Sequence, residues 1–245
     1  MKNWVLTILS LVFYAWGEPI CVLLLIVQAL VGYAGGLIVQ EARNQARKLA
    51  LGLTATVILS MLAVFKYTDF FLANFNLLTG MNVPLPGLAL PIGISFYTFR
   101  TISYITDVYR QKITPTDSLL EYVFFLTFFP CLVAGPITRA SEFLPQLRQQ
   151  PDTTPQMVYG GLWLVIIGII KKAIVADYIA QYCNIAFGNP TGYSGVELLA
   201  AIIGYAIQIY FDFSGYSDMA IGLGRMFGFH FLENFTYPFL CNRAT

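Results

Sequence analysis

Long uncharged apolar runs alternate with short polar segments along this chain. The clearest run, residues 20–40, contains no charged side chain. Because a helix needs about 20 apolar residues to cross the hydrocarbon core of a bilayer, this run predicts a membrane span. Residues 4–16 before it are apolar but fewer, and Gly-Glu-Pro at 17–19 separates the two runs. We interpret the two runs as the arms of a helical hairpin.

The next uncharged run covers residues 49–65 and ends at Lys66, whose long side chain can reach the membrane interface. Residues 74–87 are rich in Asn, Gly and Pro, which predicts an external loop. The segment at 41–48 carries three basic side chains, Arg43, Arg47 and Lys48. Because short basic loops stay in the cytoplasm, the sequence predicts that the 41–48 loop is cytoplasmic.

Residues 88–108 form an apolar run with three interruptions, at Pro91, Gly93 and Arg100. A proline and an arginine inside such a run favour a broken or re-entrant helix. A break of this kind is tolerated in a membrane only where protein or water satisfies the freed backbone groups.

Three helix starts in the second half of the chain have local signals. Ser118 with Glu121, and Ser194 with Glu197, have the spacing of a capping box. Thr154-Pro155 matches a cap followed by proline at the first helical position. In total the pattern predicts about seven or eight membrane segments.

The apolar run that starts at residue 157 reaches two adjacent lysines, Lys171 and Lys172. Lysines at the end of an apolar helix are typical of its cytoplasmic end, and this is the interpretation that we favour. The alternative is that the two lysines hold an acidic acyl donor.

Two pairs of glycines are spaced four residues apart, Gly32 with Gly36 and Gly224 with Gly228. In lipid, such spacing allows two helices to approach closely. The pattern therefore predicts packing contacts rather than a binding site.

Composition agrees with a membrane protein. Hydrophobic residues make up 57% of the 245 and charged residues only 11%, against roughly 25% charged in a typical soluble domain. The net charge of +1 gives no indication of a nucleic-acid partner. The four cysteines form no CxxC pair, so no zinc site is indicated. We expect one all-α domain over residues 1–245, a polytopic transmembrane helical bundle with broken or re-entrant helices.

Polar side chains gather in residues 211–237, directly after an apolar run. Ionisable groups at membrane depth are costly and usually face a bundle interior or a wet cavity. The alternative is an interfacial loop with solvated charges. Asp218 and Arg225 are seven residues apart and share a helical face, which suggests an ion-pair network. The candidate substrate-binding residues are Asp212, Ser214, Tyr216, Ser217, Asp218, Arg225 and Asn234.

His230 is the only histidine of the chain. Histidine is the natural general base near neutral pH. This one lies between Phe229 and Phe231 without a nucleophile beside it, which favours a structural role. We therefore assign no catalytic residue.

Three stretches, residues 90–110, 128–147 and 211–239, resemble the membrane-bound O-acyltransferase family in its bacterial alginate O-acetyltransferase branch. Residues 14–19 are similar to the early hairpin turn of that family. The resemblance implies transfer of an acetyl group, from a donor such as acetyl-coenzyme A, to a hydroxyl of an exported polysaccharide such as alginate. It also implies a multi-pass protein of the bacterial inner membrane that works with an acetyl-transfer partner outside the membrane.

The resemblance also implies a catalytic histidine beyond the Asn-Phe-x-Tyr-Pro stretch, here residues 234–238, and the chain ends at Thr245 before it. We therefore expect an incomplete domain that is inactive alone. The alternative function is a non-enzymatic membrane subunit for polysaccharide export or transport. Such a transporter should show paired broken segments in two related halves, and the sequence shows one, at 88–108.

The 41–48 prediction is tested with a single added cysteine at Asn44. A membrane-impermeant thiol reagent applied to intact cells should leave this variant no more labelled than the parent chain, because a cytoplasmic loop is shielded. Strong labelling from outside would show that the loop has the opposite orientation.

Overall fold

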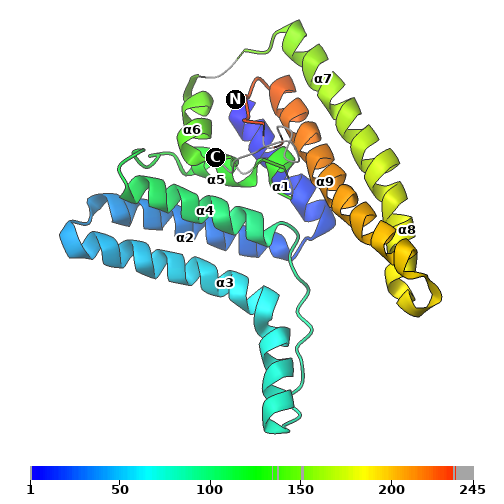
Figure 1. The fold of residues 1–245 in the computed structure, drawn as a ribbon. Helices are drawn as coiled ribbons and strands as arrows, with labels where there is room; N and C mark the ends of the chain where they lie inside the picture. The colour runs from blue at the N-terminus through cyan, green and yellow to red at the C-terminus, as the bar shows by residue number, and fades with distance from the viewer. Residues whose placement is uncertain (1, 134, 137, 150–151, 234, 236–245) are drawn as a thin grey trace. The chain divides into compact units, whose positions relative to one another are not determined.

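The computed structural model describes all residues except 1, 134, 137, 150–151, 234 and 236–245 (Figure 1). The described residues form helices and connecting segments, and they include no strand. The all-α prediction is therefore confirmed. The chain divides into two compact units, one of residues 1–133 with 137–150 and the other of residues 134–136 with 151–245.

The first unit contains the hairpin predicted from the first two apolar runs, with a break at residues 18–20. The elements of this unit are α1 (Lys2–Gly17), α2 (Cys21–Glu41), α3 (Asn44–Thr79), α4 (Ile94–Tyr109), α5 (Leu119–Thr127), η1 (Phe129–Cys131) and α6 (Ala140–Gln149).

The second unit is built on two long antiparallel helical stretches. The first is unbroken from Pro155 to Gly188 and contains a π-helical segment. Both predicted helix starts are confirmed: Thr154 accepts a hydrogen bond from the Met157 N–H, and Ser194 and Glu197 form a complete capping box. The elements are α7 (Pro155–Ile169), η2 (Ile170–Ala176), α8 (Asp177–Gly188), η3 (Pro190–Gly192) and α9 (Gly195–Met226).

Within the described part of the chain, four helical stretches are long and apolar enough to cross a membrane: Cys21–Glu41, Asn44–Thr79, Pro155–Gly188 and Gly195–Met226. This is fewer than the seven or so predicted. The apolar runs on either side of Lys171 join in one helix, and α4 and α5, with 16 and 9 residues, are shorter than a span.

The 41–48 loop was predicted too long. Only two residues separate α2 from α3, and Arg47 lies in the first turns of α3. Its guanidinium donates a 2.8 Å hydrogen bond to the Val108 carbonyl and lies 5.6 Å from the ring centroid of Tyr109. This basic residue thus joins α3 to the end of α4. The predicted external loop is also shorter, because α3 continues to Thr79 and ends at Gly80 with φ 70°.

The run at 88–108 is not one broken helix, contrary to the prediction: residues 88–93, which include Pro91 and Gly93, are not helical, and the helix begins only after them. Gly93 has φ 75°, which favours glycine, and α4 begins at Ile94. The backbone groups of Ile92, in the non-helical segment before α4, form hydrogen bonds with side chains of the α1–α2 hairpin. Tyr14 donates to the Ile92 carbonyl at 3.0 Å, and Glu18 accepts from the Ile92 N–H at 3.0 Å.

Arg100 does not interrupt α4, contrary to the expectation for a charge in an apolar run. The side chain is fully buried, with 1% of its surface exposed. Its guanidinium donates to the carbonyls of Phe125 and Leu126, the second at 3.3 Å, and lies 4.7 Å from the Phe125 ring centroid. These carbonyls are in the last turn of α5 and lack helical partners. Arg100 therefore caps α5.

Gly32 and Gly36 lie where α2 meets aromatic side chains of its neighbours, as their spacing predicted. A methyl group at Gly32 would collide with Tyr122 and Thr101, and one at Gly36 would collide with Tyr104. The rings of Tyr104 and Tyr122 are themselves 4.7 Å apart, centroid to centroid. This packing leaves no room for a side chain on α2.

Gly32→Ala and Gly52→Ala should therefore change stability in opposite directions. Overpacking at Gly32 should lower the free energy of unfolding by about 1–3 kcal/mol. Gly52 lies within α3 with nothing within 4 Å of an added methyl group. Alanine there should raise the free energy by about 0.5–1 kcal/mol. Thermal melting of the purified variants in detergent measures both. A stabilised Gly32→Ala variant would contradict this packing.

Candidate functional site

Charged side chains meet near the middle of the long helical stretch of the second unit. Lys171 and Lys172 lie in the π-helical segment η2, and α8 continues the helix beyond them to Gly188. The prediction that these lysines end the helix is wrong. The helix continues because aspartates neutralise both charges, so the chain need not leave the apolar environment there.

Lys171 pairs with α9. Its Nζ donates to Asp218 Oδ2 at 2.6 Å and to Ser214 Oγ at 2.9 Å. The Lys171 and Asp218 side chains are 27% and 20% exposed, so the pair is largely removed from the surface. An ion pair in such surroundings is screened less than one on the surface of a soluble protein.

Lys172 is shared between two carboxylates. Its Nζ lies 2.6 Å from Asp212 Oδ1 of α9 and 2.7 Å from Asp177 Oδ1 of α8. The same Nζ lies 5.5 Å from the ring centroid of Tyr216. We call Lys171, Lys172, Asp177, Asp212, Ser214 and Asp218 the lysine–aspartate network. With two lysines and three aspartates ionised, the network carries one net negative charge.

Glycines bring the two helices close enough for these bonds. Gly161 and Gly168 are seven residues apart on α7, as are Gly215 and Gly222 on α9, so each pair occupies one helical face. A methyl group at Gly161 would lie 2.5 Å from the Gly222 carbonyl oxygen, and one at Gly168 would lie 2.6 Å from that of Gly215. The backbones therefore touch at two points, and the second is next to Lys171.

Three of the seven candidate residues belong to this network: Asp212, Ser214 and Asp218. Tyr216 lies beside it, against Lys172. Ser217 is buried, with 2% of its surface exposed, and its hydroxyl has no hydrogen-bond partner in the described part of the chain.

The predicted ion pair between Asp218 and Arg225 is wrong, because Asp218 pairs with Lys171. Arg225 is in the last turn of α9, and its guanidinium lies beside Gly160 of α7. Asp218 and Arg225 do share a helical face, but Lys171 on the neighbouring helix lies nearer to Asp218. The seventh candidate, Asn234, lies outside the described residues.

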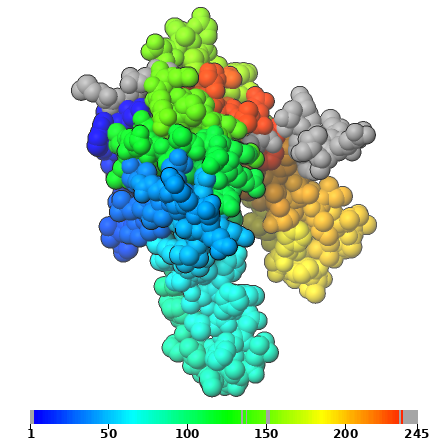
Figure 2. All heavy atoms as spheres, turned by 90° about the vertical axis from the view of Figure 1, so that its left-hand side faces the viewer, coloured from blue at the N-terminus to red at the C-terminus, as the bar shows by residue number. Residues whose placement is uncertain are grey.

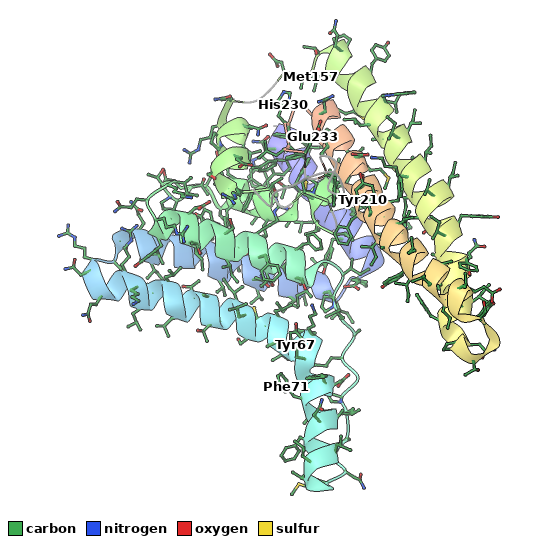
Figure 3. The ribbon with its side chains drawn as sticks, in the orientation of Figure 1. Tyr67, Phe71, Met157, Tyr210, His230 and Glu233 are labelled. Atoms are coloured by element: carbon green, nitrogen blue, oxygen red, sulfur yellow. The ribbon has the colours of Figure 1, made fainter. Side chains whose placement is uncertain are left out.

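Sequence reasoning missed Lys171, Lys172 and Asp177 as site residues. The two lysines were attributed to a helix end, and Asp177 was not singled out. The seven-residue glycine spacing on both helices was the available signal, since it marks two helical faces that can approach closely. His230 follows α9 in a non-helical segment and is exposed (Figure 3).

A polar hollow of about 520 Å³ lies in the first unit. Within it, Glu121 accepts a 2.6 Å hydrogen bond from Thr116 and lies 3.6 Å from Arg148 Nε. The capping box predicted at Ser118 is therefore only half formed, because Ser118 accepts from the Glu121 N–H while the Glu121 carboxylate turns to Thr116. These contacts give the Glu121 carboxylate a structural role, so we do not take the hollow as the functional site.

The network should contribute to stability. Replacing Asp218 with leucine leaves Lys171 without its carboxylate, and the free energy of unfolding should fall by about 1–3 kcal/mol, between the values for exposed and buried pairs. Asp117 is an exposed control, and Asp117→Leu should stay within about 0.5 kcal/mol of the parent.

Adding Lys171→Met to Asp218→Leu should restore part of the loss, because no unpaired charge then remains. Thermal melting in detergent measures all four chains. Equal melting temperatures for the two single aspartate variants would show that Asp218 is an ordinary interfacial charge.

The sequence of the chain is similar to those of several known proteins. The chain is 39% identical over 252 residues to the probable alginate O-acetylase AlgI of Pseudomonas aeruginosa, an alignment that covers 100% of this chain and 48% of that protein. It is 35% identical over 267 residues to the peptidoglycan O-acetyltransferase of Helicobacter pylori, covering 97% of this chain and 50% of that protein.

A more distant similarity, 28% over 151 residues, links 61% of the chain to 38% of the teichoic acid D-alanyltransferase of Bacillus subtilis. The chain spans about half the length of the first two of these curated relatives. The model of the membrane-bound O-acyltransferase family matches residues 110–242, more than half of the chain and all of the lysine–aspartate network. This chain, a multi-pass membrane protein, belongs to the membrane-bound O-acyltransferase family.

Proposed function

We propose that this chain forms part of a bacterial inner-membrane O-acyltransferase that transfers acetyl groups to hydroxyls of an exported polysaccharide such as alginate. Membership of the family supports acyl transfer. The names of two relatives, an alginate O-acetylase and a peptidoglycan O-acetyltransferase, support acetyl as the group and a carbohydrate polymer as the acceptor.

The observation that carries the proposal is the lysine–aspartate network inside two long apolar helices. Charged groups in such segments are expensive and mark pathways for substrates, ions or protons. This network holds ammonium donors, carboxylate acceptors and the Ser214 hydroxyl within hydrogen-bond distance of one another. Those groups are suited to a ligand that carries hydroxyls and a polar carbonyl.

The chemistry of acyl transfer explains why cations are useful here. A hydroxyl that attacks an acyl carbonyl builds negative charge on the carbonyl oxygen, and donors fixed in a low-dielectric site stabilise that charge strongly. In this proposal the ammonium groups of Lys171 and Lys172 donate hydrogen bonds to the carbonyl oxygen of the substrate. Asp212 and Asp218 orient them and accept hydrogen bonds from the substrate.

The remaining candidates, Tyr216, Ser217, Arg225 and Asn234, complete the proposed substrate-binding set. Acetyl-coenzyme A is the proposed donor, on the cytoplasmic side. The acceptor is the polysaccharide itself or an acetyl-transfer partner outside the membrane. An acetyl group that moves between these sides needs a polar path between the helices, and the network offers polar groups at mid-helix.

A non-enzymatic export or transport subunit is the alternative function. Charged groups inside the membrane would suit it equally, because transporters place substrate and ion sites there. The family match favours the acyltransferase.

A chimeric protein tests the proposal without depending on the length of this chain. The chain replaces the aligned part of the Pseudomonas aeruginosa alginate O-acetylase, in a strain that lacks that enzyme. We expect acetylated alginate to be exported. Lys171→Met and Asp218→Asn should each reduce its acetyl content at least about tenfold, because each removes groups proposed to act in the transition state.

Asp117→Asn is the matched control and should leave the acetyl content unchanged. Immunoblots of the membrane fraction compare the amount of each variant. Normal amounts of chimera with alginate exported but unacetylated would contradict the acyltransferase proposal. Loss of alginate export itself would favour the transport subunit.

A further inference from the structure

The last part of α3 extends well beyond what a membrane crossing requires. The helix has 36 residues, or roughly 54 Å at 1.5 Å per residue, whereas the hydrocarbon core is about 30 Å thick. The uncharged run at 49–65 accounts for roughly 25 Å of that length. Lys66 and Asp69 follow it, on either side of Tyr67, which lies where the helix changes direction (Figure 3).

Beyond this bend the segment projects from the rest of its unit (Figure 2). Large apolar side chains there are uncovered: Phe70 is 61% exposed, Phe71 65%, Leu77 82% and Leu78 85%. We call residues 66–90 the aromatic foot. Tyr67, at the bend, and Phe71, just beyond it, are labelled in Figure 3.

The foot has a defined conformation. After the helix ends at Gly80, the chain turns back along α3. The Asn76 amide donates to the Val83 carbonyl at 2.8 Å and accepts from the Val83 N–H at 3.0 Å. Asp69 accepts from the Gly87 N–H at 3.2 Å. Hydrogen bonds from side chains of α3 to backbone groups thus hold the returning segment against the helix.

These bonds leave one face of the helix uncovered. Asp69 and Asn76 are seven residues apart and share the face toward the returning segment. Tyr67, Phe71 and Leu78 lie on the opposite face at helical spacing. The Tyr67 and Phe71 ring centroids are 6.4 Å apart, and those of Phe70 and Phe71 are 5.6 Å apart. The helix of the foot is therefore amphipathic, with a mainly aromatic and aliphatic side on which the Asn74 amide donates to the Phe70 carbonyl at 2.7 Å.

We propose that the aromatic foot lies in the lipid bilayer at the boundary between headgroups and acyl chains, at the opposite end of α3 from Arg47. Three observations select lipid rather than a protein partner. The foot continues a helix that is itself long and apolar enough to cross a membrane. Its rings are one tyrosine, a residue enriched at the membrane interface, and three phenylalanines, a residue typical of the apolar face of interfacial helices. The third observation is the absence of charge.

No charged residue occurs between Asp69 and Arg100. Protein interfaces are enriched in arginine, and the foot beyond Asp69 contains neither arginine nor any other charged residue. Lys66 and Asp69 lie at the bend, where the helix would leave the hydrocarbon and turn along the interface. An amphipathic helix in this position buries its apolar side about 5–10 Å deep. The inference does not rest on the proposed enzymatic function.

Cysteine variants with an environment-sensitive fluorophore test the position of the foot. The full chain is reconstituted in vesicles of phosphatidylcholine and phosphatidylglycerol, with Phe71→Cys and Leu78→Cys labelled separately and the parent chain as the blank. Leu59→Cys, within the uncharged run of α3, is the control for the hydrocarbon core, and Asp152→Cys, in an exposed segment, is the control for water.

We expect lipids with a nitroxide near the headgroup to quench the Phe71 and Leu78 labels more strongly than lipids with a nitroxide near the chain end. The Leu59 label should show the reverse order, and aqueous iodide should quench the Asp152 label most. Foot labels quenched mainly by iodide would overturn the proposal in favour of a water-exposed projection. Protection from all quenchers would show a protein cover, and stronger quenching from the chain end would show a foot inserted in the core.

Discussion

Polar groups of a chain in lipid must be satisfied by other groups of the same chain, because water is absent from the bilayer core. Three features of this protein follow from that constraint. The backbone of Ile92, in the non-helical segment before α4, is bonded by Tyr14 and Glu18 of the first hairpin. The buried Arg100 binds the open carbonyls at the end of α5. The lysines of η2 are neutralised by aspartates of α8 and α9.

Local signals in the sequence were sufficient wherever the determining contact is local. The capping box at Ser194 and the helix start at Thr154 depend on atoms within three residues, and both are confirmed. The start of α4 directly after Gly93 follows from the positive φ of this glycine. The partner of Glu121 could not be predicted in the same way, because Thr116 and Arg148 compete for its carboxylate through the tertiary fold.

The candidate site was half predictable for the same reason. A concentration of polar residues on one helix is visible in the sequence, which is how Asp212, Ser214 and Asp218 were found. Their cations lie on another helix, some forty residues earlier, and only the pairing of α7 and α8 with α9 shows which lysine meets which aspartate. Helical spacing alone suggested Arg225 as the partner of Asp218. Spacing identifies residues on the same face of one helix, but it does not identify the residues of another helix that pack against that face.

The division of charge between two helices has a consequence for how this protein enters a membrane. A lysine at the centre of an isolated span costs about 2.5–3.5 kcal/mol on insertion. The Pro155–Gly188 stretch carries two, yet only one of their aspartates, Asp177, is on the same stretch. The others are synthesised later, after the short connection at η3. Each of the two helices is therefore costly to insert alone, because its charges are not all paired, whereas the pair together is less costly. This favours their passage from the translocon into lipid as a single hairpin.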